Sequence, residues 1–506
     1  MRQTVAMRLC AALAIMALAI AGGVYMATPK ASAATGGVTG YATQNGGTTG
    51  GAGGQTVRAT TGTAIHAALC SRASSSTPII IEVEGTINHG NTSKVSGGSC
   101  NTADDKIELK QISNVTLVGV GRGALFDQLG IHVREANNII IQNVTVRNVK
   151  KSGSPTSNGG DAIGMEMDVR NVWVDHVTLE ASGGESEGYD GLFDLKNNTR
   201  YVTLSYSILR NSGRGGLVGS SESDLSNGFI TYHHNLYENI DSRVPLLRGG
   251  IAHVYNNSFV NIRMSGINSR AGARARVDNN HFKDSKDVLG TFYTSAAGYW
   301  QVSGNTFDNV TWSSRSGDNN PAGPNPQSNT SVNIPYSYSL DRADCVPNIV
   351  RQTAGANKGL QVSDGACSPQ TPAPTDPPPG PTPPSGNNLS IGAGSDGSSK
   401  ASGTSYGDVR DGDMNSYWSP NGSTGSISIK WGSATTVSRI NIREAAGSVG
   451  TIGSWRVINH DTGAVLTSGS GAGVITFPQT SLRKITFEII SASGTPRVAE
   501  YETYAG

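Results

Sequence analysis

Charged side chains interrupt an otherwise apolar rhythm between Asn171 and Asn257 of this 506-residue chain. Two aspartates precede a lysine, and two arginines follow further along: Asp190, Asp194, Lys196, Arg243 and Arg248. Carboxylate oxygens are the ligands that hard cations such as calcium prefer. Arginine presents a planar fork of donors that matches a carboxylate. These residue types indicate a site where a metal ion and basic groups hold an anionic ligand.

Asp161, Asp190 and Asp194 are the candidate calcium ligands. Asp190 and Asp194 are four positions apart, which on a straight strand is about 13 Å, too far to share one ion. The chain must therefore turn between them, and Gly191 would permit such a turn. The other interpretation is that acids in a Gly-rich region are simply solvated, and the spacing leaves both open.

The candidates for binding an acidic substrate are four basic residues: Lys196, Arg214, Arg243 and Arg248. Basic groups beside a calcium site indicate an anionic polymer that the metal bridges. The alternative is that they are salt-bridge partners of the nearby acids, and the spacing does not decide between the two. His176, His233 and His234 are further candidate bases, but they occupy positions that Asn takes in later repeats. This favours a structural, hydrogen-bonded role for them.

A repeat of short strands must position these residues. Each repeat has an apolar-alternating strand, a polar position and another apolar pair. Asn257, Asn280 and Asn305 recur at intervals of 23 (280 − 257) and 25 (305 − 280) residues, and a period of about 20–50 residues is typical of a solenoid. Short strands with few helices between them predict an all-β parallel β-helix. Asn at one corner of successive coils can hydrogen-bond along the stack, so we interpret it as architecture.

The predicted organisation has four parts: a signal peptide (1–33), a β-helix domain (34–367), a Pro-rich linker (368–387) and a C-terminal β-sandwich (388–506). A basic start, an apolar run and a small-residue cleavage site predict secretion, with no membrane segment after processing. Within the β-helix part, residues 63–72 have the spacing of an amphipathic helix that could cap the stack. Residues 34–55 have no such pattern and are expected to be loose or to lie on the surface.

Four cysteines remain after removal of the signal peptide, and they can pair in three ways. The local pairs Cys70–Cys100 and Cys345–Cys367 are favoured because their members are near in sequence. A net charge of +1 argues against a nucleic-acid partner. We expect a monomer.

Several separated motifs, VWVDH, FDLK, ITYHHN and RVPLLRGG followed by HVYNN, resemble those of the pectate lyases of polysaccharide lyase family 1. The resemblance covers about residues 55–345. It implies a right-handed parallel β-helix and calcium-dependent β-elimination of polygalacturonate to unsaturated oligogalacturonides. By position, Asp161, Asp190 and Asp194 resemble the family's calcium ligands. Arg243 resembles its catalytic base, and Lys196 and Arg248 resemble its substrate-binding residues.

Two positions depart from the family pattern. Gly159 stands where many members have a second Asp, which would weaken calcium affinity. Arg214 stands where many members carry a substrate-binding Lys, which keeps the charge but changes its geometry.

The C-terminal motifs VRDGDMNSYWSP and RVAEYETY resemble the discoidin, or galactose-binding-like, β-sandwich family. That resemblance implies carbohydrate binding and a structural calcium, to which Asp411, Asp413 and Glu502 could contribute. Trp418 is expected in the core rather than on a sugar-binding surface.

Three other functions remain to be weighed. A calcium-independent pectin lyase acting on methyl esters would need no metal ligands, so Asp190 and Asp194 disfavour it. A hydrolase with paired carboxylates is disfavoured by the R-x-P-x-x-R context of Arg243. A non-catalytic wall-binding protein is disfavoured by the presence of Arg243, whereas Gly159 leaves that alternative open.

Overall fold

The computed structural model describes residues 37–370, 387–445, 448 and 451–505. The predicted signal peptide and most of the predicted Pro-rich linker lie outside this range. Within it, no helix is long and apolar enough to span a membrane.

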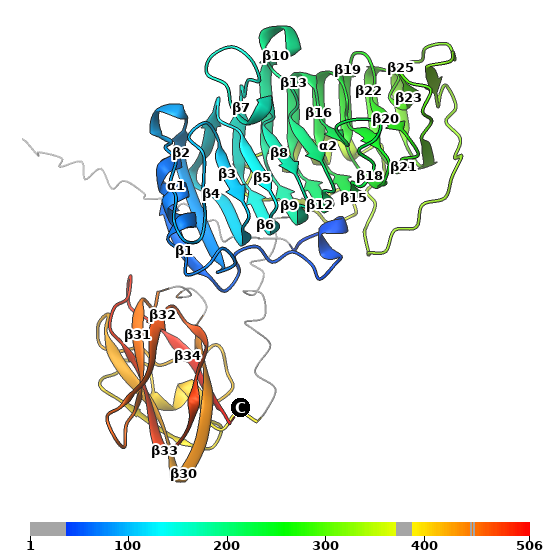
Figure 1. Ribbon diagram of the computed structural model, residues 1–506. Helices are drawn as coiled ribbons and strands as arrows, with labels where there is room; N and C mark the ends of the chain where they lie inside the picture. The colour runs from blue at the N-terminus through cyan, green and yellow to red at the C-terminus, as the bar shows by residue number, and fades with distance from the viewer. Residues whose placement is uncertain (1–36, 371–386, 446–447, 449–450, 506) are drawn as a thin grey trace, which may run out of the picture.

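The N-terminal part is a parallel β-helix in which each full coil contributes three short strands (Figure 1). The first ladder contains β3 (Ile107–Lys110), β5 (Ile131–Arg134), β8 (Ile163–Glu166), β11 (Phe193–Lys196), β14 (Leu217–Val218), β17 (Leu246–Arg248), β20 (Ile267–Arg270) and β23 (Leu289–Phe292), with antiparallel β26 (Asn319–Pro321) at its end. The all-β fold class is therefore confirmed.

Two further ladders complete the coils. The second contains β1 (Gln55–Ala59), β2 (Ile79–Ile87), β4 (Ser113–Asp127), β6 (Asn137–Gln142), β9 (Arg170–Asp175), β12 (Arg200–Ser205), β15 (Gly228–His233), β18 (Ile251–Tyr255), β21 (Arg274–Asp278) and β24 (Tyr299–Ser303). The third contains β7 (Val144–Arg147), β10 (Thr178–Gly183), β13 (Ile208–Arg214), β16 (Leu236–Ser242), β19 (Ser258–Ile262), β22 (His281–Lys286) and β25 (Thr306–Thr311). The long strands β2 and β4 take part in both.

Inward side chains of successive coils form columns because the strands stack in register. In the first ladder, Leu109, Val133, Met165 and Leu195 occupy equivalent positions and are buried. In the third, a file of aromatic rings stacks with centroids 4.8, 4.6 and 5.3 Å apart: Tyr237, Phe259, Phe282 and Phe307. One coil cannot bury its apolar face alone, so the columns are the core of the domain.

The asparagine ladder predicted from the repeat is present. The side-chain oxygen of Asn257 accepts from the backbone N–H of Asn235 at 3.0 Å, and that of Asn280 accepts from the backbone N–H of Asn257 at 2.9 Å. Asn305 continues the ladder with a bond of 2.9 Å from the backbone of Asn280. All but Asn305 are fully buried, so these bonds satisfy backbone groups at a corner that water does not reach.

Of the two expectations for the segment before β1, loose or lying on the surface, residues 37–54 follow the second. They pack across the second ladder, where the backbone N–H groups of Tyr41 and Ala42 donate to Thr231 Oγ1 at 2.9 Å and to Thr203 Oγ1 at 3.1 Å. Tyr41 is buried. Threonines on the coils supply the acceptors. The segment has no periodic pattern of its own from which this contact could be predicted.

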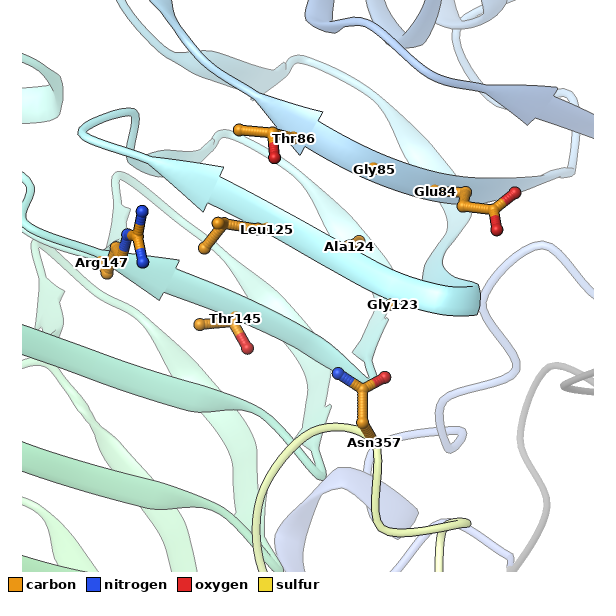
Figure 2. Close-up of a pocket in the computed structure, with 9 residues that line it drawn as sticks. All are labelled: Glu84, Gly85, Thr86, Gly123, Ala124, Leu125, Thr145, Arg147 and Asn357. Atoms are coloured by element: carbon orange, nitrogen blue, oxygen red, sulfur yellow. The ribbon is translucent and has the colours of Figure 1, made fainter.

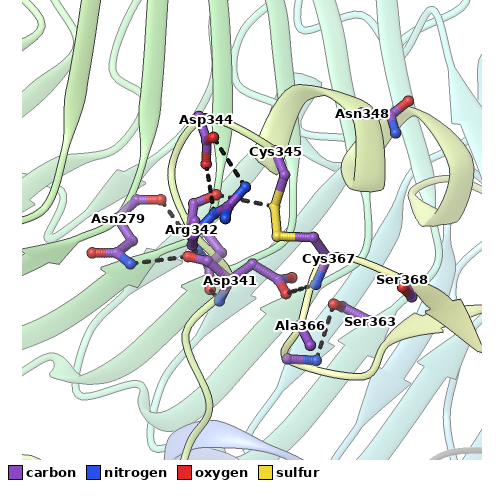
Figure 3. Close-up of a disulfide and its surroundings, with 12 residues drawn as sticks. Asn279, Asp341, Arg342, Asp344, Cys345, Asn348, Ser363, Ala366, Cys367 and Ser368 are labelled. Atoms are coloured by element: carbon purple, nitrogen blue, oxygen red, sulfur yellow. Dashed lines mark hydrogen bonds and ion pairs between the residues drawn. A yellow bond between two sulfur atoms is a disulfide. The ribbon is translucent and has the colours of Figure 1, made fainter.

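Helix α1 (Gly62–Cys70) confirms the predicted amphipathic helix, with Thr61 as its N-cap. A second helix, α2 (Val346–Thr353), was not predicted, and it packs against Ile208 and Leu236 on the outside of the third ladder. Both local disulfides, Cys70–Cys100 and Cys345–Cys367, are confirmed. Figure 3 shows the second one at the start of α2, where the backbone N–H of Cys367 donates to Asp341 at 2.7 Å.

The histidines at the corners are structural. His234 Nε2 lies 2.9 Å from the Asp341 carboxylate, the two histidine Nδ1 atoms of His233 and His234 are 2.9 Å apart, and His233 Nε2 lies 2.7 Å from Thr39 Oγ1. If His234 carries a single N–H and donates it to Asp341, then His233 donates to His234 and accepts from Thr39. This row of hydrogen bonds holds residues 37–54 and the segment around Asp341 onto the coils.

We expect this cluster to make the fold acid-sensitive. Burial, and then the neighbouring His234, lower the pKa of His233 well below its ordinary value. The unfolded chain therefore binds more protons than the folded one once the pH falls below about 6.5, so stability is lost as the pH falls further. Thermal unfolding between about pH 8 and pH 5 should show a falling Tm, with a shallower fall in His233→Gln. A Tm that is constant or rises towards pH 5 would contradict this account.

The C-terminal part is a separate antiparallel β unit. It contains β29 (Gly394–Gly397), β30 (Gly425–Glu444), β31 (Ser454–Asn459), β32 (Val465–Ser470), β33 (Gly473–Ile489) and β34 (Val498–Tyr504). Trp418 is fully buried in its core, as predicted. A short hairpin of β27 (Val362–Ser363) and β28 (Pro369–Gln370) precedes the segment outside the described residues.

Candidate active site

The predicted site residues meet along the first ladder, on its strands and on the segments that lead into them. Asp161 and Asp190 lie just before β8 and β11, Asp194 and Lys196 lie on β11, Arg214 ends β13, Arg243 follows β16, and Arg248 ends β17. Because the coils stack in register, residues far apart in sequence become neighbours. The structure thus brings together all seven residues that the sequence singles out.

Asp161 and Asp194 form a buried carboxylate pair. The ammonium of Lys196 donates to Asp161 Oδ2 at 2.9 Å and lies 3.0 Å from Asp194 Oδ2. The backbone N–H of Leu217 donates to Asp194 Oδ1 at 3.1 Å. Burial, and then the nearby Asp194 carboxylate, raise the pKa of Asp161 well above its ordinary value. The pair is held together by the lysine charge between its members.

Gly191 permits the close approach of these two acids. A Cβ atom on Gly191 would lie 2.4 Å from Asp194 Oδ1 and 3.2 Å from Asp161 Oδ1, so a side chain would collide with both carboxylates. The glycine therefore leaves room for the oxygens, in addition to the turn that the sequence suggested. It creates a cradle lined by carboxylate oxygens.

Asp190 completes the acidic group and is held by two cations. Lys151 Nζ donates to its Oδ2 at 3.0 Å, and Arg214 Nη1 donates to its Oδ1 at 2.8 Å. Arg214 also pairs with Glu185. Burial raises the pKa of Asp190, but the hydrogen bonds from Arg214 and Lys151 outweigh it and leave this pKa below its ordinary value. The sequence analysis missed Lys151, which lies in a loop with no motif around it.

Oxygen donors of this kind fit calcium. Asp161, Asp190 and Asp194 supply three carboxylates, and the cradle beside Gly191 keeps oxygens of two of them close together. A hard cation with about six to eight oxygen ligands can use such donors, with water and substrate oxygens as the rest. The charge that now neutralises these acids comes from Lys151, Lys196 and Arg214.

Arg243 differs from its basic neighbours. Among the described residues, its guanidinium has no hydrogen bond or ion pair, whereas Lys196, Arg214 and Arg248 each have both. Burial, and then the positive charge of Arg214, lower the pKa of Arg243. It has a φ of 61°, an uncommon backbone conformation for a residue with a side chain. Of the four basic candidates, Arg243 is thus the one whose charged group has no partner within the residues that the structure describes.

Arg248 and Arg270 continue the basic surface along the first ladder. They are register partners on β17 and β20, and both lie near Glu222, at 3.5 and 3.4 Å from its Oε1. Arg248 Nη1 also donates to the carbonyl of Gly219 at 2.7 Å. The sequence analysis missed Arg270, although aligning the repeats at LLR and NSR would have found it. Together these arginines could hold carboxylates of a chain lying along the coils.

A hollow of about 430 Å³ lies apart from this edge, on β2, β4 and β7 beside Asn357 (Figure 2). None of the seven candidate residues lines it. Its ionic side chains are paired, Glu84 with Arg58 and Arg147 with Asp127. The acid-and-base edge is therefore the better candidate site.

Known proteins with similar sequences and folds are consistent with a site of this geometry. A family model described as pectate lyase matches residues 12–359, more than half of the chain. The chain belongs to the pectate lyase family. This family member is accordingly a polysaccharide lyase.

Two relatives illustrate the likeness in sequence. A pectate trisaccharide-lyase of Bacillus licheniformis is 44% identical over 320 residues, which is 63% of this lyase and 86% of the relative. Pectate lyase B of Dickeya chrysanthemi is 31% identical over 280 residues, covering 52% and 72% of the two chains.

Two solved structures show the likeness in fold. The pectate lyase of Bacillus sp. N165, in complex with trigalacturonate, has a TM-score of 0.54 and 34% identity, and covers 63% of this chain and 99% of its own. Pectate lyase C of Erwinia chrysanthemi, at pH 9.5 with 30 mM Ca²⁺, has a TM-score of 0.55 and 26% identity, covering 66% and 100%. Both likenesses cover about two thirds of this chain.

Proposed function

We propose that the protein is a secreted, calcium-dependent pectate lyase that cleaves polygalacturonate by β-elimination to unsaturated oligogalacturonides. The observation that carries this proposal is the guanidinium of Arg243, which pairs with no side chain in the described part of the chain and lies beside a cradle of three aspartates. The named activities of the relatives support the substrate, and the trigalacturonate bound by a solved relative is of the same chemical class.

Each residue has a task in this reaction. Asp161, Asp190 and Asp194 would hold calcium, which supplies Lewis-acid stabilisation of charge on the uronate carboxylate. Lys196, Arg214 and Arg248 would bind uronate carboxylates and orient the chain. Arg243 would take the proton from C5, which is acidified by the adjacent carboxyl group. The electron pair of the C5–H bond then forms the C4–C5 double bond. The C4–O bond breaks with its electron pair on the leaving oxygen, which would take a proton from water.

An arginine base requires that its charge be disfavoured, because guanidinium is protonated in water at ordinary pH. Burial of Arg243 and the charges of Arg214 and Arg248 act in this direction, whereas Asp190 and Asp194 act against it. We expect kcat/KM on polygalacturonate to rise with pH between about pH 7 and pH 10, as the fraction of neutral base grows. Initial rates over this range test the expectation. An acid optimum would count against Arg243 as the base.

Calcium dependence separates this function from its alternatives. The protein is incubated with polygalacturonate and with highly esterified pectin, with added calcium or with EDTA, while the absorbance of the unsaturated product is followed. We expect product only from polygalacturonate with calcium. Product from esterified pectin in EDTA would indicate a pectin lyase, and no product from either polymer would indicate a non-catalytic wall-binding protein.

Gly159 offers a gain-of-function test of the metal site. It has a φ of 69°, which Asp and Asn tolerate, and a Cβ atom there would meet no other atom within 4 Å. We expect Gly159→Asp to raise calcium affinity by about three- to tenfold, because it adds a carboxylate beside Asp161. Titration calorimetry with calcium measures the change. Gly159→Asn is the matched control, and equal affinities for the two variants would contradict the prediction.

The remaining parts are proposed to serve the same substrate. Two disulfides suit export to an oxidising compartment. The C-terminal unit, proposed as a discoidin-like module over residues 388–506, would keep the enzyme on polysaccharide through a higher local concentration. In this unit Glu500, rather than Glu502, lies against the loop of Asp411, since it accepts from the backbone N–H of Gly412 at 2.8 Å. Glu502 instead bonds Asn441 and Tyr504.

A further inference from the structure

We infer that Lys196 is a built-in competitor of calcium: its ammonium closes the Asp161–Asp194 pair, calcium must displace it, and the displaced ammonium then binds a uronate carboxylate. This inference rests on the proposed function, because it takes calcium and uronate as the ligands. It goes beyond that function by making Lys196 a movable link between the two binding events.

The geometry places one ammonium where a metal would need oxygens. Lys196 Nζ lies 2.9 Å from Asp161 Oδ2 and 3.0 Å from Asp194 Oδ2, so a single cation already bridges the two carboxylates. The side chains of Asp161 and Asp194 are almost fully buried, at 6% and 3% exposure, whereas the Lys196 side chain keeps 23%. The lysine therefore has a path towards solvent that the acids do not have.

Protein cations already face the three candidate carboxylates. Asp161 and Asp194 face Lys196, while Asp190 faces Lys151 and Arg214. Each of the three candidate ligands thus already faces a cationic group, although Arg214 is shared with Glu185, and Gly159 adds no further acid. A divalent cation added to this arrangement would lie within a few ångströms of an ammonium, and such like charges repel strongly. Calcium binding at the pair requires the lysine to leave.

The displaced lysine has a second use. It lies on β11, and the register of the first ladder aligns it with Gly219 on the following coil and then with Arg248 and Arg270. An ammonium that leaves the acids can turn outward along this line of basic groups, where a uronate chain would lie. Calcium would then raise uronate affinity partly by releasing Lys196, and uronate would raise calcium affinity by the same factor.

Calcium calorimetry on the full-length, metal-stripped protein tests the inference without measuring activity. At about pH 8.5, we expect Lys196→Met to bind calcium about tenfold more tightly than the wild type, because no internal cation must be expelled. Lys151→Met is the matched control. Its ammonium is half exposed and, among the residues described, pairs with Asp190 alone, so we expect a change of about threefold or less. Unchanged or weaker calcium binding by Lys196→Met would overturn the inference.

The affinity for a uronate ligand tests whether the displaced Lys196 binds a uronate carboxylate. In the wild type, trigalacturonate should bind more tightly with calcium than without it, and Lys196→Met should lose most of this gain whereas Lys151→Met keeps it. A full gain in Lys196→Met would overturn the link. If Lys196→Met does not fold, ¹³C,¹⁵N-labelled lysine in the wild type, with Lys196→Arg for assignment, shows whether calcium alone moves the Lys196 signal. A signal that stays fixed as calcium saturates would also overturn the inference.

Failure of this inference is distinguishable from failure of the proposed function. A wild-type protein that releases no unsaturated product from polygalacturonate refutes the function. A wild type that is an active lyase, combined with a Lys196→Met variant of unchanged calcium affinity, refutes only the role of Lys196.

Discussion

Arg243→Ala is expected to lower kcat on polygalacturonate by a factor of about 10³ or more, because it removes the group that takes the C5 proton. Binding should survive, since the calcium cradle and the other basic groups do not depend on this side chain. Among the described residues Arg243 has no hydrogen bond or ion pair to lose, so the fold should be little affected. Initial rates together with calorimetric titration of calcium and trigalacturonate separate the two quantities.

A matched control is Arg263→Ala. Arg263 follows β19 on the next coil and forms an exposed ion pair with Asp241 at 2.5 Å. It contacts none of the seven candidate residues in the hydrogen bonds and ion pairs of the described residues. Its removal should leave kcat unchanged within about twofold. An Arg243→Ala variant with full activity would remove the proposed base.

Asn257→Leu is expected to destabilise the β-helix by about 3–5 kcal/mol, because it breaks a buried ladder on both sides. Asn257 Oδ1 accepts from the backbone and the side chain of Asn235 at 3.0 and 2.9 Å. Its Nδ2 donates to the carbonyl of Tyr232 at 2.9 Å. Leucine has a similar size but leaves these buried groups without partners. The midpoint of the denaturant-induced unfolding transition of the β-helix measures the loss.

The control for this variant is Asn348→Leu. Asn348 lies on α2, is exposed, and points away from the Cys345–Cys367 disulfide in Figure 3. Surface substitutions of this kind usually change stability by less than about 0.5 kcal/mol. If both variants unfold at the same denaturant concentration, the asparagine ladder is not what stabilises the corner.

Much of the fold could be predicted because the repeat of the β-helix is visible as a periodic pattern in the sequence. Alternating apolar residues fix the inward columns, and a recurring polar position fixes the corner, so the ladder of Asn257 and Asn280 follows from spacing. The packed segment 37–54 and helix α2 could not be predicted in this way. Each occurs once, and its partners are threonines or apolar side chains on the outside of the coils.

The candidate site was predictable in its residue types but not in its pairings. Spacing left two interpretations for the basic residues, as substrate ligands or as salt-bridge partners. The structure shows that Lys196 and Arg214 pair with aspartates, while Arg243 pairs with none within the ranges described. These ion pairs join residues on neighbouring coils. They therefore depend on the register between coils, which exists only in the folded stack. Lys151 joins the site only through that stacking.

The measurement that tests the central claim most directly compares two product ends. Polygalacturonate is digested with calcium at alkaline pH, and new reducing ends and unsaturated ends are counted in the same samples. β-Elimination predicts one unsaturated end for each new reducing end, and neither end should form when EDTA is present. Reducing ends that form without the absorbance of the unsaturated product would mean hydrolysis and would contradict the account.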